Sequence, residues 1–177
     1  MQVNQANRLL LSAVVAAALA GCAGTTTKPL NAVATLEPRS GSTVAGVVKL
    51  HERDGRVHAR VEVSGLAANS LHGFHVHDKG DCSAPDATSA GGHFNPGGVA
   101  HGEAGAAVHH AGDMPSVRAD AAGRVRADFD LGGVTLSAGP TSIIGRSFIV
   151  HRDADDYSTQ PSGNSGPRVA CGVIGAK

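Results

Sequence analysis

Alternation of apolar and polar residues along the chain predicts several short β-strands. Every second residue between positions 57 and 63 is a small apolar one, which is the period of a half-buried strand. Residues 47–50 form another apolar segment, and the Asp54-Gly55 dipeptide between the two is a strong hairpin signal. Gly123 precedes a second alternating segment, residues 125–131, and suggests a second hairpin. The pattern therefore favours a β-protein.

The remaining apolar segments and the composition favour an all-β domain. Four more strand candidates are residues 32–36, 71–77, 147–152 and 169–174. With 24 glycines and 8 prolines the chain has many helix breakers, while 41% hydrophobic residues are enough for a core. About eight short strands without a 3.6-residue period predict an antiparallel Greek-key β-sandwich or barrel.

Two long segments interrupt this series of strands. Residues 79–115 are rich in glycine and contain four of the 10 histidines, and residues 153–168 are polar without apolar periodicity. Structureless loops of this length inside a compact domain are usually functional or disordered. We therefore expect two long functional loops, of which the first carries much of the ligand chemistry.

The N-terminus has the features of an export signal. Arg8 precedes an apolar run at residues 9–20, which has the length of a signal-peptide core and is too short to span a bilayer. Leu-Ala-Gly-Cys at positions 19–22 resembles the bacterial lipobox, whose cysteine, here Cys22, takes a diacylglycerol and becomes the new N-terminus. Two acyl chains suffice for stable membrane anchoring. An ordinary signal peptide cut near Ala23 is the alternative.

These features divide the chain into three parts. We expect a lipoprotein signal peptide at residues 1–21, a lipidated flexible tether at residues 22–31, and one β-sandwich domain at residues 32–177. The expected location is the bacterial periplasm, on the membrane through the lipid. Ala23 is compatible with the outer membrane because it is not an acidic retention residue. Aromatic residues at 3% and equal numbers of basic and acidic residues, 15 each, argue against a nucleic-acid partner.

The histidines point to metal chemistry. On a strand, His75 and His77 would leave one face together, while Phe74 and Val76 turn to the other. A lone His-x-His pair is weak evidence, since exposed strand faces are often simply polar. Further metal-ligating residues follow at His93, His101, His110, Asp113 and His151. Three imidazoles and a carboxylate satisfy a tetrahedral zinc ion, and the other imidazoles suit copper, so the sequence accommodates two different metals.

Six motifs resemble those of the copper/zinc superoxide dismutases in their order and spacing. They are HGFHVH at 72–77, GGHFNP at 91–96, HG at 101–102, HAGD at 110–113, VHRDADD at 150–156 and RVACGVI at 168–174. The resemblance extends from residue 32 to the C-terminus. It implies a β-sandwich enzyme of the bacterial cell envelope.

The resemblance implies two metal sites that share one histidine. Copper would be held by His75, His77, His93 and His151. Zinc would be held by His93, His101, His110 and Asp113. His93 would bind both ions as an imidazolate, and the two flanking cations supply the electrostatic reason for losing its second proton. One copper and one zinc ion per chain are therefore expected.

Four further residues have roles that the resemblance implies. Asp155 would join a zinc histidine to a copper histidine and orient both rings. Arg168 would place a guanidinium beside copper, where a fixed cation can hold a small anion. Cys82 and Cys171 would form the family disulfide, in keeping with an oxidising compartment.

Two of these assignments have a neighbouring alternative. His109 competes with His110 for zinc, and Asp156 competes with Asp155 as the linking carboxylate. The spacing of the family motifs favours His110 and Asp155.

Three histidines have no place in the motifs. His51 and His58 alternate outward on predicted strands, where we expect them to be solvated, and His72 is expected to form a local hydrogen bond. No metal is predicted at these three residues.

The activity implied by the resemblance is superoxide dismutation. Two superoxide anions and two protons become dioxygen and hydrogen peroxide as copper cycles between Cu(II) and Cu(I), while zinc is structural and tuning. His93 would leave copper on reduction, take up a proton and later pass it to the product. Arg168 would orient the anion, and positive potential would speed its arrival, with Lys79 and Arg152 as candidates by closeness in sequence.

Two other classes of function fit part of the pattern. A periplasmic copper or zinc carrier would use the same ligands without turnover, but Arg168 argues against it because a cation beside the site repels incoming metal. A structural or adhesive β-sandwich that is only stabilised by metal would not need a copper site with an open face. Both a monomer and a homodimer are compatible with the sequence.

Overall fold

The computed structural model of the chain describes residues 30–177. The predicted signal peptide, the lipidation residue Cys22 and most of the predicted tether lie outside the described residues. Within residues 30–177, no helix is long and apolar enough to cross a membrane. The last two tether residues, Leu30 and Asn31, pair with Glu52 and His51 and so belong to the first strand.

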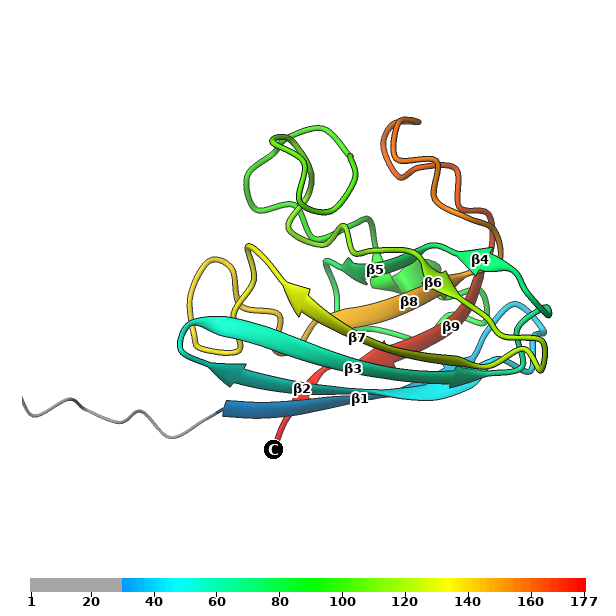
Figure 1. The fold of residues 1–177 in the computed structure, drawn as a ribbon. Coiled ribbons are helices and arrows are strands. Elements are labelled where there is room, and N and C mark those ends of the chain that lie inside the picture. The colour runs from blue at the N-terminus through cyan, green and yellow to red at the C-terminus, as the bar shows by residue number, and fades with distance from the viewer. Residues whose placement is uncertain (1–29) are drawn as a thin grey trace, which may run out of the picture.

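Ten strands and one short 3-10 helix make up the regular structure of residues 30–177. The strands are β1 (Leu30–Pro38), β2 (Ala45–Arg53), β3 (Arg56–Ser64), β4 (Leu71–His72), β5 (Phe74–His77), β6 (Val117–Arg118), β7 (Val125–Leu131), β8 (Ser147–His151), β9 (Arg168–Val173) and β10 (Gly175–Ala176). The helix η1 covers Thr88–Ala90. The sheet has the order β5-β8-β9-β1-β2-β3-β7, with β10 on β1, and β4 pairs with β6. It curls into a half-barrel (Figure 1), which confirms the predicted antiparallel β-fold.

The first predicted hairpin consists of β2 and β3. Asp54 and Gly55 connect the strands with φ of 52° and 74°, as a two-residue type I′ turn requires. Residues of β3 alternate between exposed and buried along its whole length. The local pattern therefore predicted both the strands and the turn correctly.

The second predicted hairpin is wrong in its partner. β7 is a strand, but it pairs with β3, with Val125 opposite Val63 and Leu131 opposite Val57. The preceding strand β6 pairs with β4 instead. Alternation identifies a strand but not the strand with which it pairs. The partner is the strand beside which the apolar face can be buried, and β7 buries its apolar residues in the same core as β3.

The predicted strand at residues 71–77 is divided at Gly73 into β4 and β5. The Gly73 N–H donates to the carbonyl of Asp153 at 2.8 Å. A Cβ atom at position 73 would lie 2.6 Å from Oγ of Ser165, so the close approach requires glycine. β4 then pairs with β6 and β5 with β8.

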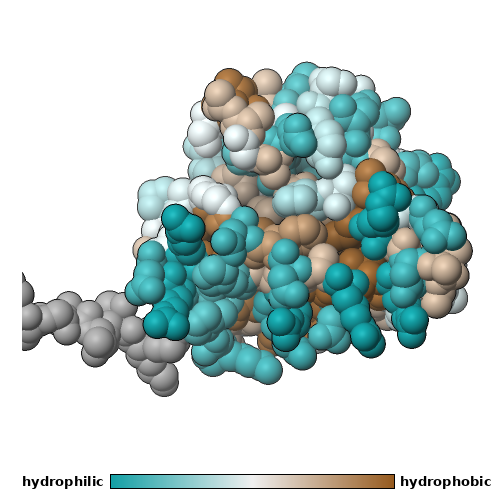
Figure 2. Space-filling model, in the orientation of Figure 1, coloured by the Kyte–Doolittle hydropathy of each residue, from teal (hydrophilic) through white to brown (hydrophobic). Residues whose placement is uncertain are grey.

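The core supports β5 from one side. Phe74 and Val76 are both fully buried, and Phe74 stacks on Phe148 of β8 with 4.9 Å between the ring centroids. On the face shown in Figure 2, hydrophilic side chains cover much of the surface, and hydrophobic residues show between them. Because side chains alternate along a strand, the packing of Phe74 and Val76 leaves His75 and His77 on the opposite face.

The two long loops lie above β5 and β8 (Figure 1). The first runs from β5 to β6 and the second joins β8 to β9. The side chain of Gln160, in the second loop, pairs with the backbone of His101 in the first. Its Oε1 accepts the His101 N–H at 2.9 Å and its Nε2 donates to the His101 carbonyl at 3.0 Å. The loops are therefore held together directly at a predicted ligand.

Candidate metal centre

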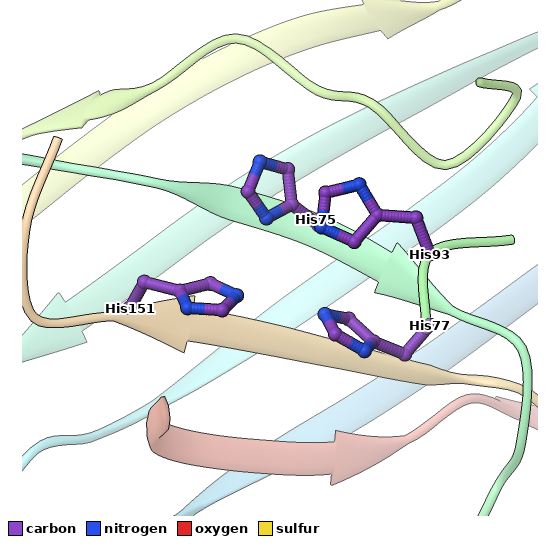
Figure 3. A group of neighbouring side chains, drawn as sticks. All are labelled: His75, His77, His93 and His151. Carbon is purple, nitrogen blue, oxygen red and sulfur yellow. The ribbon is translucent and has the colours of Figure 1, made fainter. Parts of the chain in front are cut away.

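Two neighbouring strands and one loop bring four histidines together. His75 and His77 lie on β5, and His151 ends the antiparallel strand β8. His93, from the first loop, forms a backbone bridge with His77. The four rings turn toward one another (Figure 3), and all four residues are buried.

Hydrogen bonds on the far side of two rings decide which nitrogen faces the group. Nδ1 of His77 lies 2.9 Å from the carbonyl oxygen of Gly91, and Nδ1 of His151 lies 3.0 Å from that of Gly166. A carbonyl can only accept, so each Nδ1 carries the hydrogen and each neutral ring presents its lone pair at Nε2.

The bare nitrogens form a set that fits a metal ion. Among the described residues, four buried ring nitrogens have no hydrogen-bond partner: Nδ1 of His75 and Nε2 of His77, His93 and His151. These four histidines offer ligand atoms that lie within 4.8 Å of one another. Buried polar atoms without partners are costly and uncommon, so a cation that accepts their lone pairs accounts for them. An all-imidazole set suits copper.

A second group shares His93 and adds His101, His110 and Asp113. Oδ1 of Asp113 lies 2.8 Å from Nδ1 of His93, 2.9 Å from Nδ1 of His101 and 3.2 Å from Nδ1 of His110. Ligand atoms around a tetrahedral zinc ion are about 3.3 Å apart. The other Asp113 oxygen accepts the N–H groups of Gly102 and His110 at 3.1 and 2.7 Å, which turns Oδ1 toward the group. This geometry fits zinc.

The protonation states suit metal binding. Burial, and next the neighbouring His93, hold the pKa of His75 and His77 well below the usual range. Burial also lowers the pKa of His151 to about 4. Burial opposes ionisation of Asp113, but hydrogen bonds from His93 and the backbone hold its pKa well below the usual range. At neutral pH His75, His77 and His151 therefore offer imidazole lone pairs and Asp113 offers a carboxylate. Burial opposes protonation of His101, but the carboxylates of Asp155 and Asp113 outweigh it and raise the pKa of that ring, so a metal there would displace a proton.

Asp155 links the two groups. Its Oδ2 lies 2.6 Å from Nε2 of His75 and its Oδ1 lies 2.9 Å from Nε2 of His101. The hydrogen bond on one nitrogen of each ring leaves the other nitrogen for a metal. A Cβ atom on Gly163 would overlap the Asp155 carboxylate, so the glycine makes room for this link. Asp156 instead accepts hydrogen bonds from the exposed turn that follows it.

Gly163 and Gln160 were not singled out in the sequence. Gly163 has a φ of 68°, but a glycine in a polar loop carries no signal of what it contacts. The pairing of Gln160 with the His101 backbone joins residues 59 positions apart. Neither contact has a local sequence pattern that could reveal it.

Arg168, the first residue of β9, lines the same cleft as four histidines, which are His77, His93, His110 and His151. Its Nη1 donates to the carbonyl of Ala87 and its Nη2 to that of Gly91, each at 2.7 Å. Burial lowers the pKa of Arg168, which keeps its charge because the usual value of arginine is very high. Within the described part of the chain, Arg168 is the only Lys, Arg, Asp or Glu that lines this cleft.

A disulfide joins Cys82 to Cys171, 89 residues apart. Cys171 lies on β9 beyond Arg168, and Cys82 lies in the loop whose carbonyls hold the guanidinium. Nε of Arg39 also donates to the Cys82 carbonyl at 2.8 Å. The bridge therefore ties the loop to the strand that carries Arg168.

The remaining candidates lie outside the two groups. Nδ1 of His109 donates to the carbonyl of His110 at 2.7 Å, and His109 belongs to neither group. Lys79 is exposed and does not line the cleft. Arg152 forms an ion pair with Asp153 at 3.0 Å and lines a different hollow. Closeness in sequence to the site thus does not place either cation in the cleft.

Comparisons with known proteins agree with this geometry. The family model described as copper/zinc superoxide dismutase matches residues 44–174. A copper-zinc superoxide dismutase of Paramecium bursaria Chlorella virus 1 is 40% identical over 155 residues, which cover 84% of this chain and 80% of the relative. Copper-zinc superoxide dismutase 2 of Aquifex aeolicus is 37% identical over 168 residues, 93% of this chain and 98% of the relative.

A solved structure supports the fold. The crystal structure of the clock protein EA4 is similar with a TM-score of 0.75 and 41% identity, covering 84% of this chain and 96% of that one. At this identity the likeness extends beyond the bare fold. The family match includes every residue of both histidine groups.

Proposed function

The chain belongs to the copper/zinc superoxide dismutase family, and from this premise we propose how its own residues carry out the reaction. The protein is an oxidoreductase that binds one copper and one zinc ion per chain. We propose that His75, His77, His93 and His151 hold copper and that His93, His101, His110 and Asp113 hold zinc. The observation that carries this proposal is the set of four unpartnered nitrogens, three of which belong to histidines that line one cleft with Arg168.

The reaction converts two superoxide anions and two protons into dioxygen and hydrogen peroxide. When bound, copper supplies one-electron exchange between Cu(II) and Cu(I). Arg168 binds the incoming anion: two of its five N–H donors are used by the carbonyls of Ala87 and Gly91, and the others are available to superoxide. The two carbonyls hold the guanidinium in one orientation, so the anion is positioned without loss of side-chain entropy at each turnover.

His93 supplies a proton at the site. Its Nε2 faces the copper group and its Nδ1 faces Asp113 at 2.8 Å. While the first superoxide is oxidised to dioxygen, His93 takes up one proton from solvent at Nε2, and while the second superoxide is reduced, His93 passes that proton to the peroxide product. The second proton comes from solvent through the cleft. Asp113, His101 and His110 keep the His93 ring in place throughout, because the predicted zinc group that they form with His93 includes the other ring nitrogen, Nδ1.

Metal analysis combined with an activity assay tests this function. The metal-replete chain should contain one copper and one zinc ion and should inhibit superoxide-dependent reduction of cytochrome c. His93→Ala should lower the rate at least tenfold, although His75, His77 and His151 remain to bind copper. A sample that binds copper but no zinc, with His101 intact, would contradict the zinc assignment. Two bound metals without dismutation would favour the metal carrier.

We also propose that the protein is a membrane-anchored lipoprotein of the bacterial periplasm. The lipobox-like sequence at positions 19–22 supports this proposal, and Ala23 is compatible with the outer membrane. Mass spectrometry of the mature protein should find a diacylglycerol on Cys22, and the protein should partition into detergent. Cys22→Ser should abolish both. An unmodified N-terminus at Ala23 or later would contradict lipidation.

A further inference from the structure

Two histidines outside the metal centre face each other on the outer surface of the sheet. His51 on β2 lies directly opposite His58 on β3. The row continues to Asn31 on β1, opposite His51, and to Asp130 on β7, opposite His58. All four side chains line one surface hollow, and His58 has 49% of its side chain exposed. No metal was expected at either histidine taken alone, but the two-residue Asp54-Gly55 turn places the two residues opposite each other, and this pairing changes that expectation.

Each histidine is backed by an oxygen that sets its tautomer. Nδ1 of His51 lies 2.9 Å from Oδ1 of Asn31, and Nδ1 of His58 contacts Oδ1 of Asp130. The amide oxygen of Asn31 accepts a hydrogen bond from Nδ1 of His51, and the negative charge of the Asp130 carboxylate favours a hydrogen on Nδ1 of His58. Both neutral rings therefore present their lone pair at Nε2, and neither Nε2 has a hydrogen-bond partner among residues 30–177. Metal-binding histidines in proteins are backed in the same way.

The pair has the spacing and the surroundings for one cation. Directly opposite residues on antiparallel strands have Cβ atoms about 4.5–5.5 Å apart, within reach of two imidazoles that bind one ion. Lys49 and Arg60 line the same hollow, but Asp128 and Asp130 balance their charge. Arg60 is itself paired with Asp128 at 2.9 Å. An incoming cation thus meets no net repulsion.

We propose that His51 and His58 form a second, surface metal site that binds one divalent transition-metal ion through their Nε2 atoms. Imidazole ligands favour copper(II), which stands at the top of the divalent affinity order. Two protein ligands on an exposed surface make this site weaker than the buried four-ligand groups. The site is separate from the catalytic copper, so this proposal does not depend on the proposed reaction mechanism.

Copper(II) titration of the chain with both buried sites filled tests the proposal. Calorimetry and electron paramagnetic resonance should detect one additional copper ion per chain, with a spectrum distinct from that of the buried ion. Zinc content is measured in the same samples, so that exchange at the buried site is recognised. His51→Ala and His58→Ala should each weaken the additional binding at least tenfold, while leaving dismutation unchanged.

A matched control separates ligation from surface charge. Lys49→Ala removes a cation from the same hollow but no ligand, so the additional copper should bind as tightly as in the parent or slightly more tightly. Two results would overturn the proposal. One is a parent chain that takes up no additional copper, and the other is an additional copper ion whose affinity is the same in His51→Ala and His58→Ala.

Discussion

The Nδ1 atom of His72 lies 3.0 Å from the backbone carbonyl oxygen of His151, although the two residues are 79 positions apart in the sequence. Nε2 of His72 lies 2.6 Å from Oγ of Ser70, which is the local contact expected from the sequence. The His151 N–H in turn donates to the carbonyl of Gly73 at 2.8 Å. His72 is only 3% exposed, so a buried side chain holds the backbone of a predicted copper ligand.

His72→Ala should destabilise the protein and disturb the copper group. The substitution leaves the buried carbonyl of His151 without a donor, which costs about 1–3 kcal/mol. Urea denaturation of the metal-free, disulfide-bonded chain should show this loss. In the metal-replete variant the copper resonance spectrum should change while zinc content stays the same. His58→Ala, on the exposed outer face, should change the unfolding free energy by less than about 0.5 kcal/mol. A variant with parental stability and spectrum would refute the role of His72.

Arg168→Ala should lower the dismutation rate at least tenfold and leave both metals bound, because the guanidinium is not a ligand. Arg168→Lys should retain more activity, since it keeps the charge but loses the two fixed carbonyl contacts. Arg152→Ala makes the same charge change outside the cleft and should alter the rate less than twofold. Rates are measured at matched metal content. Equal losses in the Arg168 and Arg152 variants would indicate a general charge effect instead.

The rate of the parent enzyme should fall as ionic strength rises, because salt screens the attraction of Arg168 for superoxide over about 10 Å at 0.1 M. Arg168 is the only Lys, Arg, Asp or Glu among the described cleft-lining residues, so Arg168→Ala should weaken this dependence, while the charge of the bound metals remains. Stopped-flow rates between low and moderate salt measure both slopes. A variant slope as steep as that of the parent would show that Arg168 does not steer superoxide.

Loss of the Cys82–Cys171 disulfide should lower the free energy of unfolding by about 4–5 kcal/mol on the chain-entropy model. The bridge spans 89 residues, and a long closed loop restricts the unfolded chain strongly. The double variant Cys82→Ser, Cys171→Ser is compared with the parent by urea denaturation of the metal-free chains. Cys22→Ser, which leaves the bridge intact, serves as the control. A loss below about 1 kcal/mol would mean that residual structure already restricts the unfolded chain when the disulfide is absent.

The carboxyl group of Asp156 should remain ionised in the folded protein at pH 3. Hydrogen bonds from the side chain and backbone of Thr159, and from Ser158, lower its pKa to about 2. A lowered folded-state pKa adds stability above the unfolded value of about 3.9, and this contribution is lost as pH falls toward 2. Carboxyl-carbon NMR titration should show the low pKa. Thr159→Val should raise it more than Ser158→Ala does, and equal small shifts would contradict the assignment.

Local patterns in the sequence were sufficient for most strands and for the first hairpin. The alternation at residues 57–63 and the Asp54-Gly55 turn are properties of neighbouring residues, and the structure has both. The partner of β7 could not be predicted in this way, because β7 pairs with the distant strand β3 and a pattern of neighbouring residues does not specify a distant partner.

The candidate site shows the same division. Motif order and spacing indicated the histidines and Asp113, because residue types and the alternation of a strand can be recognised directly in the sequence. Which nitrogen of each ring is bare depends on acceptors such as the carbonyls of Gly91 and Gly166, which lie 14 and 15 residues from His77 and His151. A backbone carbonyl has no sequence signature, so these contacts appear only once the loops are folded.

The sequence by itself determined the strand periodicity, the turn chemistry and the residue types available to metals, because these depend on each residue and its near neighbours. Only the tertiary structure decided that His72 holds the carbonyl of His151 and that Asp130 lies opposite His58. Both relationships depend on the register and approach of separate strands, which are set by burying the apolar faces of the whole sheet together and not by any one segment.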